Sequence, residues 1–486
     1  MTVRDHEEQG DDDLAETAVR TAPPWLISAV FHMVLMIVLG LWMVVYKYDD
    51  RVSLEVVYAE QLGEQLEFDT PLVGLSEDVE EEPVLSISEL PEVEDPFAAP
   101  PELVDIKLEG TTATSEIEAG QIGLALSGRQ EGMKKARLGR YGGNATTEAA
   151  VQLGLKWLAR QQHKEGFWSL EGPYPNGATS ENFEAATAMA LLAFQGAGNT
   201  HQKGPFKRNV ARGWEWLLKQ QDANGNFFHE GMFNAAFYTQ GQCAIAICEL
   251  YGMSKDPKFL DPAERAIMYC LTSQSPEGGW KYAPRGRSDT SVTGWIVMAL
   301  QSAKMAGLEV PEDNLRRVSR FLDRVADDYG SRYAYERGKE PTVCMTAEAL
   351  LCRQYLGWER NDERLINGCN WIFRERNQIS FNRNRDVYFW YYATQVAHHM
   401  GGEYWKRWNA VMRQVMPEEQ IKTGKQAGSW DPVRPTRDQW EAHGGRLYVT
   451  CLSIYMLEVY YRHLPIYHKV YSPYLLPSAA EQHGKP

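Results

Sequence analysis

The sequence predicts an all-α fold: an (α/α)6 toroid of six helical hairpins, preceded by one transmembrane helix and a disordered acidic linker. Three observations support this prediction. One helical unit recurs six times between Thr147 and Tyr461, one long apolar run lies near the N-terminus, and an acidic stretch with prolines separates the two. The repeat is roughly 45 to 57 residues long, which is the length of two helices and their connections.

The order of these features divides the chain into five predicted parts. They are an acidic N-terminal tail at 1–24, a transmembrane signal anchor at 25–46, an acidic flexible linker at 47–145, the toroid at 146–465 and a C-terminal tail at 466–486.

The predicted membrane span runs from Trp25 to Tyr46 and contains no Asp, Glu, Lys or Arg. At about 1.5 Å per residue its 22 residues can cross a bilayer core of about 30 Å. No small-residue cleavage pattern follows it, so we interpret it as an uncleaved anchor rather than a removed signal peptide. A buried core helix is the alternative. We expect a single-pass membrane protein with the toroid on the extracytoplasmic side, although lysines and arginines flank both ends of the span.

The linker is defined by its charge. Between Glu77 and Asp105 there are eleven acidic residues, five prolines and no basic residue. Such a segment buries too little apolar surface to offset the entropy cost of ordering, so we expect it to be disordered. Residues 1–145 hold 10 Lys and Arg against 29 Asp and Glu, a net charge of −19, whereas the whole chain carries −15. The toroid is therefore close to neutral, and we expect no nucleic-acid partner.

Each hairpin is predicted to pair an outer helix that carries an aromatic residue with an inner helix rich in small residues. Because a helix enclosed by a ring must be apolar on most sides, the small-residue segments are the expected inner ring. An open solenoid is the alternative. The outer aromatics are Trp157, Trp214, Tyr269, Phe321, Trp371 and Trp408. The inner segments are 183–196, 237–252, 289–307, 342–357, 386–401 and 446–461.

Three turns share the pattern Q-x-x-x-G-x-aromatic or its close variant, beginning at Gln162, Gln221 and Gln274. We expect the glutamine to bond free carbonyls at the helix end, the glycine to adopt a left-handed conformation, and the aromatic residue to pack over the turn. The sixth turn keeps only Gly428 and Trp430, and the fourth and fifth turns are degenerate. The seven cysteines are odd in number, form no C-x-x-C pair and are interpreted as small core residues.

These turns and hairpins resemble the prenyltransferase and squalene oxidase repeat family, the α/α toroid of squalene–hopene cyclases and protein prenyltransferase β subunits. The resemblance covers nearly all of residues 146–461 and suggests a bacterial, membrane-anchored member. It implies a polyprenyl or other lipid-like ligand in a central apolar cavity.

The catalytic motifs of that family are incomplete here. Asp289 matches one prenyltransferase zinc ligand, but Ser291 and Val449 stand where the family has Cys and His. We therefore expect no metal and no cofactor. The cyclase motif D-x-D-D is matched only by Asp289, and Arg287 is expected to keep that carboxyl ionised. The sequence thus predicts a binding protein without the usual catalysis of the family, and an active cyclase or transferase using Asp289 is the alternative.

A candidate site lies where the inner helices begin, because in this topology their N-termini gather at one mouth and carry partial positive charge. An anionic lipid head is expected at arginines near these starts, and an apolar chain among aromatics below. The arginines are Arg285, Arg287, Arg383, Arg385 and Arg446. The aromatics are Tyr238, Trp295, Tyr388, Trp390 and Tyr391. Asp289 and Asp386, the candidate catalytic residues, lie at the same starts.

Other interpretations of these residues stay open. Asp289 and Asp386 are also plausible N-caps, the aromatics are plausible ring core, and His398 and His399 are more plausible as helix caps than as metal ligands. Toroids of this kind also occur in glycoside hydrolases and polysaccharide lyases, which use paired carboxylates. Such a pair has four candidates: Asp289, Asp386, Glu184 and Glu348. A non-catalytic scaffold held away from the membrane is the third class.

Overall fold

The structure, a computed structural model, describes residues 126, 128–229 and 231–467, which are mainly helical. The expected membrane span at 25–46 and most of the expected linker lie outside these residues. Within the described range, no helix is both long enough and apolar enough to cross a membrane.

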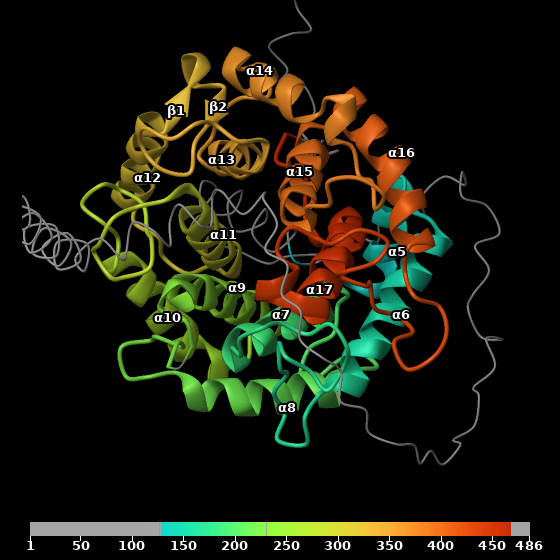
Figure 1. The fold of residues 1–486 in the computed structure, drawn as a ribbon. Coiled ribbons are helices and arrows are strands. Elements are labelled where there is room, and N and C mark those ends of the chain that lie inside the picture. Colours follow the sequence, from blue (N-terminus) through green and yellow to red (C-terminus); the bar gives the residue numbers. More distant parts are fainter. Residues whose placement is uncertain (1–125, 127, 230, 468–486) are drawn as a thin grey trace, which may run out of the picture. The chain divides into compact units, whose positions relative to one another are not determined.

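Six inner helices form a closed ring in which each contacts the next, and α17 contacts α7 (Figure 1). The toroid prediction is therefore confirmed, and an open solenoid is excluded. The inner helices are α7 Phe183–Gly196, α9 Ala236–Ser254, α11 Thr290–Ala306, α13 Val343–Tyr355, α15 Val387–Met400 and α17 Glu441–Arg462.

Six outer helices surround this ring, and α6 closes the outer layer by contacting both α16 and α17. The outer helices are α6 Ala145–Gln161, α8 Lys207–Leu217, α10 Leu260–Thr272, α12 Glu312–Arg324, α14 Glu363–Ile372 and α16 Gly402–Glu418. Short 3-10 helices are η2 Leu218–Gln220, η3 Phe233–Ala235, η4 Pro257–Phe259, η5 Asp328–Gly330 and η6 Glu375–Asn377.

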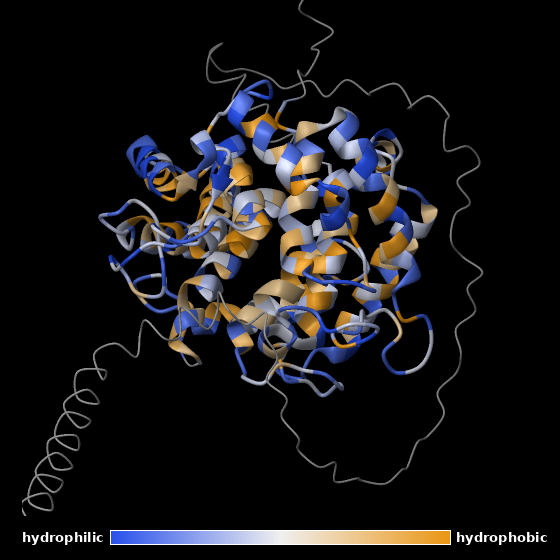
Figure 2. Ribbon diagram, turned by 45° about the horizontal axis from the view of Figure 1, so that its top comes forward, coloured by the Kyte–Doolittle hydropathy of each residue, from blue (hydrophilic) through white to orange (hydrophobic). Residues whose placement is uncertain are grey.

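The two layers differ in how much of each helix is buried. Along α7 every residue except Phe183 is buried, whereas α12 buries only four residues that recur on one face: Leu315, Val318, Phe321 and Leu322. A helix covered on all sides must be apolar throughout, and an outer helix needs only one apolar stripe. Figure 2 shows the result, with hydrophobic residues between the layers and hydrophilic residues on the outer helices and loops.

Residues before the predicted start of the toroid at residue 146 also contact it. Helix α5, Glu131–Arg140, precedes α6 and contacts α17. The segment after it is also attached, because Trp405 Nε1 donates to the Tyr141 carbonyl at 2.8 Å and Asn409 Nδ2 donates to the Gly142 carbonyl at 3.1 Å. This segment is basic, with five Lys and Arg against one Glu over residues 126–145, unlike the acidic stretch at 77–105. Its tertiary contacts attach it to the toroid.

The turn glutamines join neighbouring hairpins rather than ending their own helices. Gln162 Nε2 donates to the Gly166 carbonyl at 2.7 Å and to the Asn209 carbonyl of the next outer helix at 3.0 Å. Gln274 repeats this pair of bonds with the Gly278 and Asn314 carbonyls. Gln162 and Gln274 thus each satisfy one carbonyl in their own turn and one in the adjacent repeat. In the second turn, Gln221 Nε2 donates to the Pro262 carbonyl of α10 at 2.8 Å, whereas Gln240 Nε2 donates to the Gly225 carbonyl at 3.1 Å.

The sixth turn contains an equivalent glutamine with the same two hydrogen bonds, which the sequence pattern did not find. Gln420 Nε2 donates to the Gly428 carbonyl at 2.9 Å and to the Ala150 carbonyl of α6 at 2.8 Å. Four extra residues separate this glutamine from its glycine, so the Q-x-x-x-G spacing does not find it. Because α6 is the first outer helix, these bonds close the ring.

The fourth turn differs from the others by a small hairpin of β1 Ala326–Asp327 and β2 Arg332–Tyr333, paired antiparallel. Its aromatic residue is nevertheless in the same place, because Tyr333 N donates to Thr346 Oγ1 of the inner helix at 2.9 Å. Trp168 and Trp280 make the equivalent bond to Thr187 and Thr293. The turn described as degenerate from the sequence therefore keeps its link to the inner ring.

Candidate functional site

Four inner helices begin with a side-chain cap, in which an oxygen accepts the backbone N–H three residues on at 2.7 to 3.1 Å. The caps are Asn182, Asp289, Thr342 and Asp386. Both aspartates predicted as site residues are therefore N-caps. The inner helices point the same way: Asn182 Nδ2 bonds Thr239 Oγ1 at the starts of α7 and α9.

Asp289 is fully buried, and its environment differs from the sequence expectation. Its Oδ2 accepts a hydrogen bond from the Tyr335 hydroxyl at 2.8 Å, and burial raises its pKa to about 7. Arg287 instead pairs with Glu336 at 3.3 Å. The expectation that Arg287 holds Asp289 ionised is wrong, because the cost of desolvation outweighs the nearby charges.

We expect Asp289→Asn to flatten the pH dependence of stability. The folded state keeps the proton of Asp289 up to about pH 7, whereas the unfolded chain loses it near about pH 4. The contribution of this group to stability is therefore full below about pH 4 and is lost as the pH rises through about 7. Asparagine keeps the cap but cannot ionise. Urea unfolding between pH 4 and 8 measures the effect, and an unchanged profile in the variant would show that folded Asp289 is ionised.

Asp386 is half-buried, and a second carboxyl, which the sequence did not indicate, lies near it. Burial, followed by the charge of Asp438, raises the pKa of Asp386 to about 7. Asp438 is buried and accepts backbone N–H bonds from Val387 at 2.9 Å and Trp440 at 3.1 Å. Its carboxylate lies 3.9 Å from Arg385 Nε. Two carboxyls thus share the start of α15.

Two of the five predicted head-group arginines are buried and already bonded to the protein. Arg385 Nη1 donates to the Asp431 carbonyl at 2.5 Å. Arg446 donates to the Pro175 carbonyl at 2.9 Å and pairs with Asp431 at 2.9 Å. Both arginines therefore hold the loop that precedes α17. The other three are exposed: Arg285, Arg287 and Arg383.

The predicted aromatics do not all face the centre of the ring. The Trp295 and Tyr391 rings stack with centroids 5.9 Å apart, and Tyr388 accepts a hydrogen bond from Trp295 Nε1 at 2.9 Å. Because α13 lies between α11 and α15 in the ring, these contacts fill its centre. Trp390 packs against Phe381 of the fifth turn, with centroids 5.3 Å apart. We therefore assign Trp390 to the wall between the two layers.

Half-buried side chains from four inner helices converge above these aromatics. We call this set the mouth cluster: Tyr238 of α9, Cys344 of α13, the α15 cap Asp386 and Tyr448 of α17. Burial raises the pKa of Tyr448, and the other three members all contribute to that shift. All four lie at or near the start of an inner helix, and their partial exposure shows that solvent reaches this end of the ring.

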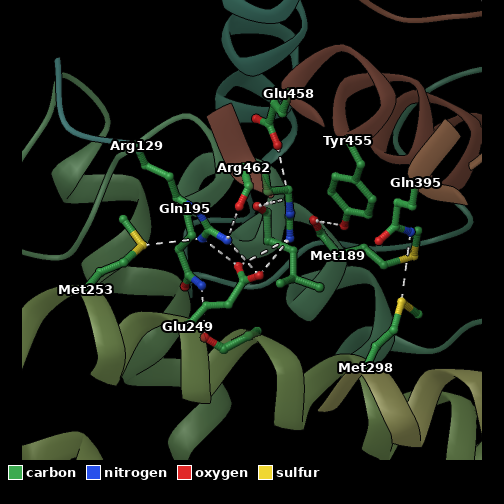
Figure 3. Close-up of polar contacts among 12 residues, drawn as sticks. Arg129, Met189, Gln195, Glu249, Met253, Met298, Gln395, Tyr455, Glu458 and Arg462 are labelled. Atoms are coloured by element: carbon green, nitrogen blue, oxygen red, sulfur yellow. Dashed lines mark hydrogen bonds and ion pairs between the residues drawn. The ribbon is translucent and has the colours of Figure 1, made fainter. Parts of the chain in front are cut away.

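The opposite end of the ring is closed by buried ion pairs (Figure 3). Glu249 of α9 accepts bonds from Arg129 at 2.8 and 2.9 Å and from Arg462 at 3.2 and 3.4 Å. Arg462 also pairs with Glu458 at 3.0 Å. Leu126 packs closely against Gly252 near the end of α9, since a Cβ on this glycine would lie only 2.3 Å from the Leu126 side chain. Residues before α5 therefore help to cover this end of the ring. The mouth cluster is therefore at the more accessible end.

Exposed apolar side chains lie at the starts of α7 and α9, at the end of the ring that carries the mouth cluster. Phe183 at the start of α7 is 38% exposed, and Met232 and Phe233, just before α9, are 43% and 64% exposed. The two segments are adjacent, because a Cβ on Gly231 would lie 3.6 Å from the Glu181 carbonyl. Large apolar side chains gathered at a mouth are typical of sites that contact apolar ligands.

No group of three or more His, Cys, Asp or Glu among the described residues is arranged to hold a metal ion. Ser291 bonds the Tyr388 hydroxyl at 2.8 Å, and Val449 is buried in α17. Glu184 is buried in the first turn of α7. The chemistry that the mouth offers is that of hydroxyls and protonatable carboxyls.

Sequence reasoning missed Asp438, Cys344 and Tyr448 as members of the site. Asp438 lies in a loop whose position depends on Arg385 and Arg446, so no local pattern indicates it. Cys344 and Tyr448 follow an inner-helix start by one or two residues in the predicted frame, like Tyr238. Alignment of the six inner segments could therefore have indicated both.

No family model matches the chain, and no curated protein matches it. Solved structures with similar helices include the GH76A α-1,6-mannanase of Salegentibacter sp. HEL1_6, at 11% identity and a TM-score of 0.47 over 64% of this chain and 98% of the mannanase. The type II terpene cyclase MstE from Scytonema matches at 12% identity and a TM-score of 0.43, over 64% and 97%. Cellobiose 2-epimerase from Bacillus thermoamylovorans B4167 matches at 12% identity and a TM-score of 0.46, over 64% and 97%.

The names of these three proteins describe different activities. At such identities and TM-scores the similarity carries no information on the activity of this chain. The toroid assignment stands on the helix contacts described above.

Proposed function

We propose that the toroid binds an amphiphilic, lipid-like ligand at the mouth of its inner ring and does not catalyse a terpenoid reaction. The observation that carries this proposal is that exposed Phe183, Met232 and Phe233 lie at the same end of the ring as the half-buried polar mouth cluster. An apolar surface beside a polar recess matches the two parts of an amphiphile. The incomplete zinc and D-x-D-D motifs support binding without turnover.

The ligand is proposed to lie across the mouth rather than along the ring axis. Stacked Trp295 and Tyr391 fill the centre, and the Arg129–Glu249–Arg462 network covers the far end. A long polyprenyl chain running through the ring would have to displace both. This differs from the central cavity that the family resemblance implies.

A second candidate is a carbohydrate-active or cyclase-type enzyme. Burial raises the pKa of both Asp289 and Asp386 to about 7, and a carboxyl poised near neutrality can act as a general acid. A hydroxyl-rich substrate would meet Tyr238, Tyr448 and these carboxyls. This candidate predicts that soluble oligosaccharides, rather than amphiphiles, occupy the mouth.

Cys344 provides the test, because it is half-buried whereas the other six cysteines are buried. We expect farnesol or farnesyl phosphate, below its micelle concentration, to slow N-ethylmaleimide modification of Cys344 in the full-length protein. At a ligand concentration ten times Kd the slowing should be about tenfold. Mass spectrometry of the peptide that contains Cys344 measures the rate.

Phe233→Ser should weaken this protection, and Met268→Ser is the matched control, because Met268 is 56% exposed on outer helix α10. Equal weakening by both variants would argue against contact with the mouth. Protection by mannotetraose or cellotetraose, with none from the amphiphiles, would replace the proposal with the carbohydrate candidate. If no ligand class protects Cys344, the proposed function is overturned.

A further inference from the structure

Glu348 is a fully buried carboxyl directly below the mouth cluster. It lies four residues after Cys344 on α13, so the two side chains share one helix face about one turn, or about 5.4 Å, apart. Its contacts come from α11 and α15, the two helices that flank α13 in the ring. Glu348 therefore lies one helical turn below Cys344, between the flanking helices α11 and α15.

Helix α11 accommodates this carboxyl by having a glycine beside it. A Cβ on Gly294 would lie 2.2 Å from Glu348 Oε1. Glycine in the middle of a helix costs about 1 kcal/mol relative to alanine. The space at Gly294 therefore fits the Glu348 carboxyl in this position.

One carboxyl oxygen of Glu348 has a defined partner. Trp295 Nε1 donates to the Tyr388 hydroxyl at 2.9 Å, and an indole nitrogen can only donate. Tyr388 thus accepts from Trp295, and its own proton is free to be donated to Glu348 Oε1 at 3.3 Å. Among the described residues, Oε2 has no hydrogen-bond partner.

The other oxygen is left with an unmet hydrogen bond. Burial raises the pKa of Glu348 well above the usual range of a glutamic acid, and the Asp289 carboxyl raises it further, whereas Tyr388 and Tyr392 partly offset this shift. Burial therefore favours the protonated, neutral form of this side chain. A buried polar group without a partner destabilises the folded state, and a hydrogen bond to a ligand oxygen would remove that cost.

We propose that Glu348 recognises the head of the ligand by donating a hydrogen bond from Oε2 to an uncharged oxygen, such as that of an alcohol, ester or ketone. The mouth then selects an uncharged head over a phosphate. The inference rests on the proposed amphiphile function and specifies its ligand class. Asp289, Asp386 and Asp438 lie in the same region, and buried Arg385 and Arg446 are already bonded to the loop before α17, so neither of these two arginines is free to bind a phosphate there.

The test compares farnesol with farnesyl phosphate in the Cys344 protection assay. In the parent protein we expect farnesol to protect at a concentration at least about tenfold lower, since one hydrogen bond to a buried partner corresponds to about a factor of ten. Glu348→Gln keeps a donor of similar shape and should bind farnesol within about threefold of the parent. Glu348→Leu has no donor and should require at least about tenfold more farnesol.

The outcomes separate this inference from the function on which it rests. If farnesyl phosphate protects as well as farnesol or better, the neutral-head inference is overturned, and an anionic head at Arg285, Arg287 and Arg383 replaces it. Unchanged farnesol binding by Glu348→Leu also overturns it. If neither probe protects Cys344 in the parent, the proposed function itself fails. If circular dichroism shows that Glu348→Leu does not fold, a second measurement still tests the inference. It is the ratio of the farnesol and farnesyl phosphate concentrations that protect Cys344, measured in the parent and in Glu348→Gln.

Discussion

Arg462→Ala is expected to lower the free energy of unfolding of the toroid by about 3 to 5 kcal/mol, because it breaks a buried ion-pair network. Arg462 is 3% exposed and pairs with both Glu249 and Glu458. Its removal leaves Glu458 without its ion-pair partner and Glu249 with Arg129 alone. A buried carboxylate without a counter-charge cannot recover its lost hydration.

Urea unfolding followed by circular dichroism measures this loss, and Arg140→Ala is the control, because Arg140 is exposed on α5. We expect the control to change stability by less than about 0.5 kcal/mol. A loss of under about 1 kcal/mol in Arg462→Ala would show that the network contributes little net stability.

The same network should make the parent sensitive to acid. Burial alone would raise the pKa of Glu249, but Arg129 and Arg462 outweigh it and the net pKa is lowered. The stability that this group contributes is therefore present at neutral pH and is lost as the pH falls through its lowered pKa.

Gly428→Ala is expected to have the second large effect, because this glycine lies where the ring closes. Its φ is +102°, and a Cβ would lie 2.1 Å from the Leu153 carbonyl oxygen of α6. Backbone cannot move aside as a flexible side chain can. A left-handed alanine costs about 1 to 2 kcal/mol, and overpacking adds about 1 to 3 kcal/mol.

Gly424→Ala separates these two contributions. Gly424 also has a positive φ, +76°, but a Cβ there would have nothing within 4 Å. We expect it to lose about 1 to 2 kcal/mol, and the difference between the two variants measures the clash with α6. Thermal unfolding of the full-length variants provides the comparison, and equal losses would contradict the role of Gly428 in closing the ring.

The candidate site could be predicted only in part. Asp289, Asp386, Tyr238 and Tyr388 lie at or near the mouth as the helix starts indicated, because N-cap chemistry and helix spacing are local properties. The roles of Arg385 and Arg446 could not be predicted, since both bond a loop that is distant in sequence. The sequence also could not show whether Trp390 faces the centre of the ring or the outer layer, because both faces of an inner helix are apolar.

By itself, the sequence determined the repeat, the order of outer and inner helices and the turns with Gly166, Gly225 and Gly278, because these follow from helix periodicity and backbone sterics. Only the tertiary structure decided that α5 packs against α17, that Gln420 closes the ring, and that Glu348 is fully buried. Each of these depends on which groups meet across the ring. Hydrogen-bond partners and desolvation depend on contacts between residues that are distant in sequence, and a local sequence pattern does not contain this information.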